Sequence, residues 1–546
     1  MNAVATADRR WPSLIILSFG VALVVVDITV VNVVMPSIIG DLDLEIADAE
    51  WINTAYPLAF AALLIPFGRL GDRLGSKRLF QAGLGVFGVA SLFVGVSGSL
   101  WMLVGSRGFQ GVGAAMILPA TLSTIHATFG GRDRAIAFGI WGSVIAGMVA
   151  VGPLIGGWIT TEWSWRWAFY INVPLAAMTI AIALRWVVDR RARDTETGAD
   201  FAGLVTVSLG MIALVLALIE GPRHGWLSPT RELRFGDWVW PLEQVSIVPV
   251  AAVVAIVCLT AFVRIERNGR AADQAVLLDL DLFSIDTFRR GNVLAVIVGL
   301  GEFGLVFVLP LFVRIVLGYS PFQTGILLLA MAGGGFIGGP LAAGISRRFD
   351  ARCAVVTGMA LEAGGVLGVA LMLSPDVAGG RFAIPLFVYG LGVGMASAQL
   401  ASVVMVDVPE KQAGQASGMQ STTRQLGAAL GIAILGTVFA TSLVSLTDSG
   451  LSEIAALDIQ AKDRIVTQVA DSAGWYVEAL RYWHPDYAPV VEKIDQAIVG
   501  AASRAALTAL AFFIAGIIQA LRLPGGASRL AEPSPPREDL AAEATT

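Results

Sequence analysis

Long apolar segments dominate the chain and restrict its fold more than any other feature. Fourteen of them are mainly apolar over about 20 residues, the length that a helix needs to cross a hydrocarbon core of ~30 Å. Only helices or closed barrels can span a membrane, because a backbone in lipid must satisfy its own hydrogen bonds. These segments are continuous rather than short and alternating, which favours helices. The predicted spans are 13–35, 51–70, 79–98, 101–123, 135–159, 167–188, 201–220, 244–264, 291–314, 322–345, 353–373, 382–405, 418–441 and 500–521.

The composition agrees with this reading and excludes other classes. Of 546 residues, 56% are hydrophobic and 14% charged, whereas a soluble domain has about 45–50% apolar and about 25% charged residues. One soluble core of this length, a disordered chain and a disulfide scaffold are therefore excluded. The 2 cysteines and 3 histidines show no metal-ligand spacing. We expect an all-α polytopic membrane protein that binds no metal and is not an enzyme.

The placement of basic residues predicts the topology. Most of the 37 Lys and Arg residues lie in segments that become cytoplasmic if the N-terminus is inside. The first apolar run is too long for a signal peptide and contains Asp27, so we interpret it as an uncleaved span. With an even number of spans, both termini are predicted to be cytoplasmic in a multi-pass protein of the cell membrane.

A short internal repeat predicts the domain organisation. Gly111-Val-Gly-Ala-Ala115 in the fourth span recurs as Gly392-Val-Gly-Met-Ala396 in the twelfth. Two six-helix bundles separated by an inserted helix pair would produce this relation. The predicted parts are an N-terminal bundle (1–188), the inserted pair, spans 7 and 8, with an inner connection (189–290), a C-terminal bundle (291–523) with an outer loop (442–499), and a disordered cytoplasmic tail (524–546).

Four motifs in the first five spans carry a family resemblance. They read Asp27-Ile-Thr29-Val-Val-Asn32-Val-Val-Met-Pro36, Gly68-Arg-Leu-Gly71-Asp72-Arg73-Leu-Gly75-Ser-Lys77-Arg78, Arg107-Gly-Phe-Gln110-Gly111-Val-Gly113 and Gly152-Pro153-Leu-Ile-Gly156-Gly157. In combination they resemble the motifs of the major facilitator superfamily. The first of them resembles the first-span motif of its fourteen-span drug:proton antiporters, the multidrug efflux type.

The resemblance implies a secondary active exporter that works by alternating access. It would exchange protons for amphipathic or cationic drug-like compounds, confer antibiotic resistance, need no cofactor beyond the proton gradient, and function as a monomer. Its partners would be the small-molecule substrate, protons and membrane lipid, with no nucleic acid. Export of a lipid, an endogenous metabolite or a self-made antibiotic stays open on the same fold. A non-transporting receptor or lipid-handling scaffold is the alternative from another class.

For two of the motifs, the resemblance implies a role in the conformational change: one as a gate and the other as a pivot. The turn after the second span would form a cytoplasmic gate, for which Arg132 and Arg134 are candidate partners; positive-inside topology alone would also explain its charges. The span-5 glycines and proline would form a pivot that favours export, although close helix packing explains them equally well. The gate residues are Gly68, Gly71, Asp72, Arg73, Gly75, Lys77, Arg78 and Arg134, and the antiporter-motif residues are Gly152, Pro153, Gly156 and Gly157.

Ionisable residues inside spans are costly and therefore candidate functional groups. From a rise of ~1.5 Å per residue, Asp27 and Arg107 both lie about 21 Å from the inner face, so we expect them to pair and to face a shared cavity. Glu302 and Glu362 lie about 16 and 14 Å deep with no basic partner expected at that depth, so they could exchange protons. The structural alternatives are a packing ion pair for the first two, a passive vestibule position for Glu302 and an interhelical hydrogen bond for Glu362.

Polar residues and the outer loop complete the candidate features. Asn32, Gln110 and Gln399 could line a substrate cavity, or hydrogen-bond between helices. The outer loop 442–499 has helical patterning and a cluster of aromatic residues. We interpret it as a solvated cap whose aromatics rest at the lipid interface, with a role in substrate entry or exit as the alternative.

Overall fold

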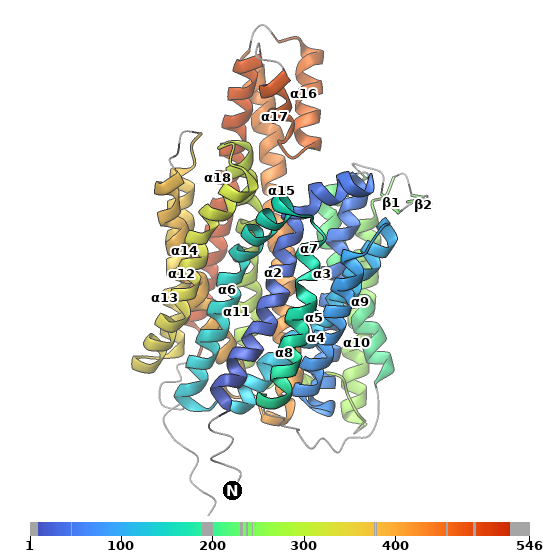
Figure 1. The fold of residues 1–546 in the computed structure, drawn as a ribbon, viewed down its shortest axis with the longest axis vertical. Helices are drawn as coiled ribbons and strands as arrows, with labels where there is room; N and C mark the ends of the chain where they lie inside the picture. The colour runs from blue at the N-terminus through green and yellow to red at the C-terminus, as the bar shows by residue number, and fades with distance from the viewer. Residues whose placement is uncertain are drawn as a thin grey trace, which may run out of the picture.

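The computed structural model describes residues 9–524 apart from 45, 188–199, 230–232, 236–237, 243, 273, 376, 378, 455–456 and 484–486. The long helices stand side by side along one common direction (Figure 1). Within the described residues, 14 helical segments are long and apolar enough to cross a membrane, which confirms the predicted number of spans. The predicted disordered tail lies outside the described residues except for Pro524.

The helices follow the predicted spans closely and mostly extend beyond them. The spans are α2 (Arg10–Leu42), α3 (Ile46–Leu74), α4 (Ser76–Gly95), α5 (Leu100–Thr128), α6 (Gly131–Glu162), α7 (Trp167–Tyr170) with α8 (Asn172–Trp186), α9 (Phe201–His224), α10 (Ile247–Ala271), α11 (Asp286–Ile315), α12 (Pro321–Arg348), α13 (Ala351–Met372), α14 (Gly379–Met405), α15 (Ala413–Ser452) and α18 (Ala488–Leu521). The shorter elements are β1 (Arg234–Phe235) paired antiparallel with β2 (Trp238–Val239), the 3-10 helices Leu280–Ser284 and Glu410–Gln412, α16 (Ile459–Asp471) and α17 (Tyr476–Trp483).

Polar capping residues fix where several of these helices begin. The carboxylate of Asp200 accepts the backbone N–H of Gly203 at the start of α9, at 2.7 Å. Ser320 and Gln323 form a reciprocal capping box at the start of α12. Such caps satisfy N–H groups that have no partner within the helix. The apolar stretch that follows each cap is thereby held at a defined depth.

The helices pack as two groups that meet along two seams. In the first group α5 packs on α3 and α4, and α2 packs on α6; in the second α14 packs on α12 and α13, and α11 packs on α15 and α18. One seam is α6 against α12 and α14, and the other is α3 and α5 against α15. Helices α9 and α10 pack on each other, and α9 also contacts α3 and α15. The division into residues 1–188, 189–290 and 291–523 stays a prediction.

Glycines close the α3–α15 seam at the end of the molecule where the N-terminus lies (Figure 1). A Cβ at Gly418 would lie 2.7 Å from the carbonyl oxygen of Leu64, and a Cβ at Gly68 would overlap the carbonyl oxygen of Gly414. The two backbones are therefore in direct contact. Further along the same helices, residues of α3 and α15 face a cavity instead of each other.

The ends of α15 and α18 project from the opposite end of the molecule, together with α16 and α17 (Figure 1). The predicted outer loop is therefore largely helical, because hydropathy identifies only the part of a helix that is apolar enough for lipid. Lys493 of α18 binds Glu453 at the end of α15 and holds the pKa of that carboxyl below its usual value. This pair ties the two projecting helices together.

Candidate functional site

A cavity of about 1240 Å³ lies between the two groups of helices. Its wall includes residues of α2, α3, α5, α6, α9, α11, α12, α14 and α15, and the turn after α16. Most of these residues are apolar, and among the described lining residues only Glu302 and Arg424 carry a charge. A large apolar cavity with few polar groups is the kind of site that binds amphipathic small molecules.

Glu302 and Arg424 form an ion pair in this wall. The guanidinium Nη2 of Arg424 in α15 donates to Glu302 Oε2 in α11 at 3.0 Å, and to the Ser397 hydroxyl in α14 at 3.0 Å. The same hydroxyl donates to Glu302 Oε1 at 2.8 Å. The prediction that Glu302 has no basic partner is therefore wrong. Its partner lies inside the predicted span 418–441, and the signal was available in the sequence.

Glu362 in α13 lies in the same group of helices but outside the cavity wall. Its side chain is 0% exposed, and neither carboxyl oxygen has a hydrogen-bond partner among the described residues. It packs against α14, where a Cβ at Gly392 would lie 2.7 Å from its Cγ. Glu302 and Arg424 act on it electrostatically. The hydrogen bond between helices that was its structural alternative is thus not formed within the described part of the chain.

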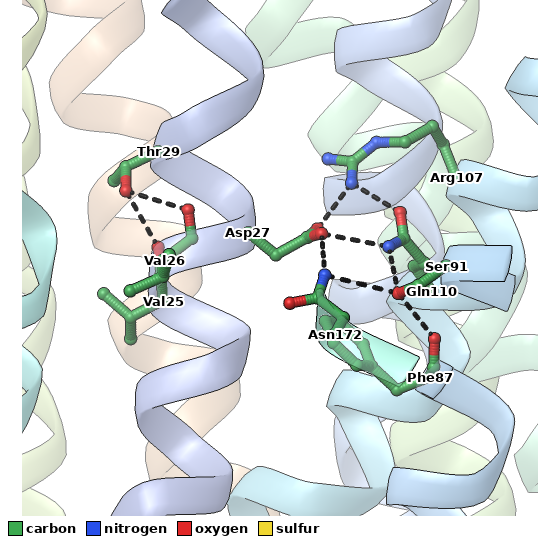
Figure 2. Close-up of polar contacts among 9 residues, drawn as sticks. All are labelled: Val25, Val26, Asp27, Thr29, Phe87, Ser91, Arg107, Gln110 and Asn172. Carbon is green, nitrogen blue, oxygen red and sulfur yellow. Dashed lines mark hydrogen bonds and ion pairs between the residues drawn. The ribbon is translucent and has the colours of Figure 1, made fainter. Parts of the chain in front are cut away.

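Asp27 and Arg107 are brought together as their depths suggest (Figure 2). Arg107 Nη1 donates to Asp27 Oδ2 at 2.5 Å, and the side-chain amides of Gln110 and Asn172 each donate to Asp27 Oδ1 at 3.0 Å. The Ser91 hydroxyl accepts from Gln110 at 2.8 Å and donates to the carbonyl of Phe87 in turn. The carboxylate of α2 is thereby joined to α4, α5 and α8. Asn172 and Ser91 were not predicted as site residues.

This network lies behind the cavity wall and not in it. Asp27, Arg107 and Gln110 are 1%, 2% and 0% exposed and are absent from the cavity lining. The ring of Tyr56, which does line the cavity, lies 4.7 Å from the Arg107 guanidinium. The expectation that the pair faces the cavity was therefore wrong. Ile28 of α2 lines the cavity, whereas the Asp27 side chain points into the interior of the first group of helices.

Of the other two predicted cavity residues, one lines the cavity and the other does not. Asn32 lines the cavity. Gln399 lies outside the lining and is fully buried, where its amide donates to the carbonyl of Ala135 at 3.2 Å and accepts from the Ser346 hydroxyl at 2.8 Å. It therefore joins α14 to α6 across the seam between the two groups. The interhelical alternative is the correct one for Gln110 and Gln399.

Asp72 bridges the two groups of helices at the closed end. Its carboxylate, 4% exposed, accepts the backbone N–H of Gly414 at 2.7 Å and of Gln415 at 3.0 Å. These are the first residues of α15, where unpaired N–H groups and the helix dipole favour a negative charge. The motif of the first group thus caps a helix of the second group.

The remaining gate residues surround this contact. Arg134 donates to the carbonyls of Phe129, His126 and Val406, at 2.9, 3.4 and 3.5 Å, so it reaches the loop between α14 and α15. The side chain of the other candidate partner, Arg132, lies outside the described residues. Lys77 donates to the carbonyl of Leu184 at 2.9 Å. Gly75 has φ 95°, a positive value that glycine adopts readily, and it makes the tight turn between α3 and α4. Gly68, Gly71, Asp72 and Arg73 lie in the last turns of α3, and Arg78 lies in the first turn of α4.

The antiporter-motif glycines let α6 lie directly against α2. A Cβ at Gly152 would overlap the Thr29 hydroxyl and lie 2.9 Å from the carbonyl oxygen of Val26, and a Cβ at Gly156 would overlap Val30. Pro153 lies between them inside α6. Small residues are what close helix approach in a membrane requires.

We expect Gly152→Val to lower the melting temperature of the purified protein and to abolish the export that the resemblance implies, because the added bulk must push α6 away from α2. Overpacking of this kind costs about 1–3 kcal/mol. Gly157→Ala is the matched control, since its Cβ would lie 3.8 Å from Val33, an ordinary contact. Unchanged melting and transport in Gly152→Val would contradict both the packing and the pivot interpretation.

Comparisons with known proteins place the chain among transporters. The family model described as Major Facilitator Superfamily matches residues 17–432. The tetracenomycin C resistance and export protein of Streptomyces glaucescens is 32% identical over 432 residues, which are 79% of this chain and 76% of that protein. The puromycin resistance protein pur8 of Streptomyces alboniger is 32% identical over 82% of this chain and 86% of its own.

Two solved structures share the fold at low sequence identity. The human organic anion transporter MFSD10 (TETRAN) has a TM-score of 0.58 and 12% identity, with 93% of this chain and 98% of that chain covered. The proton:xylose symporter XylE has a TM-score of 0.55 and 11% identity, with 95% and 97% covered. At these identities the likeness concerns the fold alone.

Proposed function

This chain belongs to the Major Facilitator Superfamily, and we propose on that basis that it exports amphipathic or cationic drug-like compounds in exchange for protons. Membership makes the protein a multi-pass membrane transporter rather than an enzyme. Drug export is supported by relatives named as antibiotic resistance and export proteins. The observation that carries the proposal is the Glu302–Arg424 pair in a mainly apolar cavity whose other described lining residues are uncharged, with the buried carboxyl of Glu362 nearby.

The cavity supplies both parts of an amphipathic binding site. Its apolar wall would hold the hydrophobic body of a substrate, and the Glu302 carboxylate would attract a positive charge. Arg424 already pairs with that carboxylate, so a cationic substrate would bind Glu302 by displacing the Arg424 guanidinium. A proton on Glu302 would remove the attraction and release the substrate.

Glu362 would be the group that carries the proton. A carboxyl group buried without a hydrogen bond tolerates charge poorly, so it takes up a proton readily and exposes it only when the helices rearrange. Its electrostatic link to Glu302 and Arg424 would let protonation of Glu362 alter substrate binding. A proton on Glu362 and a cationic substrate at Glu302 would then weaken each other's binding.

Asp27 and Arg107 would couple protonation to the packing of the first group. Protonation of Asp27 would remove the charge that holds Arg107, Gln110 and Asn172 around one carboxylate. Because these partners come from α5 and α8 while Asp27 belongs to α2, the junction of the three helices would loosen as a unit. Its action on the substrate would pass through Tyr56, which lies between Arg107 and the cavity.

Alternating access would open the end that Asp72 closes. We propose that this end faces the cytoplasm, because most basic residues of the sequence lie there, and that both termini are on that side of the cell membrane. The closed α3–α15 contact then belongs to a state in which substrate cannot enter from the cytoplasm. The contact of α6 with α2 at Gly152 and Gly156 would serve as the pivot. The proton gradient would supply the energy, and a single chain would suffice.

Uptake into inverted membrane vesicles tests this function. We expect an inside-acid gradient to drive accumulation of ethidium, tetraphenylphosphonium or puromycin, and an uncoupler to abolish it. Vesicles without the protein are the control. Gradient-driven uptake of a lipid or a metabolite, with none of these three compounds, would replace the drug-export proposal by the corresponding alternative. No gradient-dependent movement of any solute would favour a receptor or a lipid-handling scaffold.

A further inference from the structure

Helix α9 contributes a face to the cavity although it belongs to neither group of six helices predicted from the repeat. Val215, Ile219 and Pro222 all line the cavity. Their spacing of four and three residues places them on one side of a helix, over about 10 Å of its length. Leu209 points about 120° away from Val215 around the helix axis, is 50% exposed and is absent from the lining. The helix therefore has a cavity side and an outer side.

The seam between α3 and α15 leaves room for this face. The two helices touch where Gly68 meets Gly414 and where Leu64 meets Gly418. Further along, Pro57 of α3 and Gln425 of α15 line the cavity. The separation of α3 from α15 would leave the cavity open toward the membrane, and α9, which contacts both helices, lies across it.

Contacts with neighbouring helices hold α9 in this position. The Ser208 hydroxyl donates to the carbonyl of Ala62 in α3 at 3.1 Å. The helix also packs along α10 and contacts α3 and α15. These contacts place α9 in the wall.

We propose that α9 is one wall of the substrate site, and that Val215, Ile219 and Pro222 select which compounds are exported. This inference rests on the proposed export function. The ligands that it favours are amphipathic cations whose apolar part reaches from the Glu302–Arg424 pair to the α3–α15 seam. Because the α9 face is purely apolar, it would bind by shape and hydrophobic contact and admit many related compounds.

Cysteine labelling tests whether α9 faces the cavity. The chain has 2 cysteines, Cys258 and Cys353, which are replaced by alanine in a background that keeps its transport. Ile219→Cys and Leu209→Cys are then treated with a positively charged methanethiosulfonate reagent, which reacts only with thiols that water reaches. We expect Ile219→Cys to react about tenfold faster, and tetraphenylphosphonium or ethidium to slow that reaction.

The possible outcomes distinguish a failure of the α9 proposal from a failure of the proposed export function. If Ile219→Cys reacts no faster than Leu209→Cys, α9 is not a cavity wall. If it reacts faster but no substrate protects it while efflux proceeds, α9 does not contact substrate. If it reacts faster and neither protection nor efflux is found, the wall stands and drug export fails.

A substitution that narrows the cavity tests selection itself. We expect Ile219→Trp to change the ratio of kcat/KM for ethidium and tetraphenylphosphonium by about tenfold, the scale at which apolar pockets discriminate. Leu209→Trp, on the outer side of the same helix, should leave that ratio within about twofold. Equal ratios in the two variants would overturn the role of α9 in selection.

Discussion

Asp72→Asn is expected to reduce export by about tenfold or more while the amount of protein in the membrane stays unchanged. The carboxylate accepts one backbone N–H from each of Gly414 and Gln415, and the asparagine side chain has a single acceptor oxygen and no charge. A hydrogen bond to a charged group contributes about 1.5–3 kcal/mol. Its loss would depopulate the state closed at this end by about 10–150-fold. The protein would remain open toward the cytoplasm and turn over slowly.

Spin labels at Leu74 and Lys411, both exposed on the two sides of this contact, can report the change directly. We expect their distance distribution to shift to longer values in Asp72→Asn. Asp133→Asn is the matched control, because Asp133 pairs with Arg10 at 2.8 Å on the surface, with both side chains 36% exposed. Exposed pairs contribute about 0–1 kcal/mol. Normal export and an unshifted distance in Asp72→Asn would show that the contact does not act as a gate.

The depth of intramembrane residues could be predicted from the sequence, but the direction in which they point was harder to assign. Helix rise and bilayer thickness place Asp27 and Arg107 at one depth, and they do meet. Depth says nothing about the side of the helix. Asp27 and Asn32 are five residues apart and therefore lie on different faces of α2. Only Asn32 lines the cavity, so helical periodicity already argued against placing both residues there.

Some interaction partners from distant parts of the chain can be recognised in the sequence, and others cannot. Arg424 lies within a predicted span, so the basic partner of Glu302 was visible in the sequence and was missed. The partner of Asp72 is the backbone of a helix 342 residues away. Any residue can supply a backbone N–H, so no side-chain pattern marks it. Gly68 and Gly414 indicate close helix packing, but they do not identify the helix that each one packs against.

The cavity itself could not be located from the sequence. Its wall combines residues from helices far apart in the chain, and the contribution of α9 depends on where α3 and α15 separate. Hydropathy marks all of these segments as spans and distinguishes none of them as cavity-lining. The number of spans and the family motifs, in contrast, depend on local composition and short spacings, and these could be predicted.

Glu362→Gln is expected to abolish proton-driven export while substrate binding and thermal stability are retained. The glutamine side chain has nearly the same shape as a protonated glutamate and is neutral, so it fits a site that is 0% exposed and offers no hydrogen bond within the described residues. It cannot release or take up a proton. Counterflow, in which labelled substrate exchanges for unlabelled substrate without a gradient, should therefore persist, whereas uptake driven by an inside-acid gradient should fall to the level of empty vesicles.

Two further variants make this result specific to Glu362. Glu266→Gln changes another buried carboxylate, but Glu266 Oε2 accepts the backbone N–H groups of Leu277 and Leu278 at 3.0 and 3.3 Å, so its role is to hold the connection before α11. That variant should lose stability and keep its coupling.

Glu302→Gln leaves Arg424 in the cavity without its counter-ion, so affinity for tetraphenylphosphonium should fall about tenfold, whereas uncharged substrates are affected less. If the triple variant Asp27→Asn, Glu302→Gln, Glu362→Gln still couples export to the proton gradient, none of these carboxylates carries the proton.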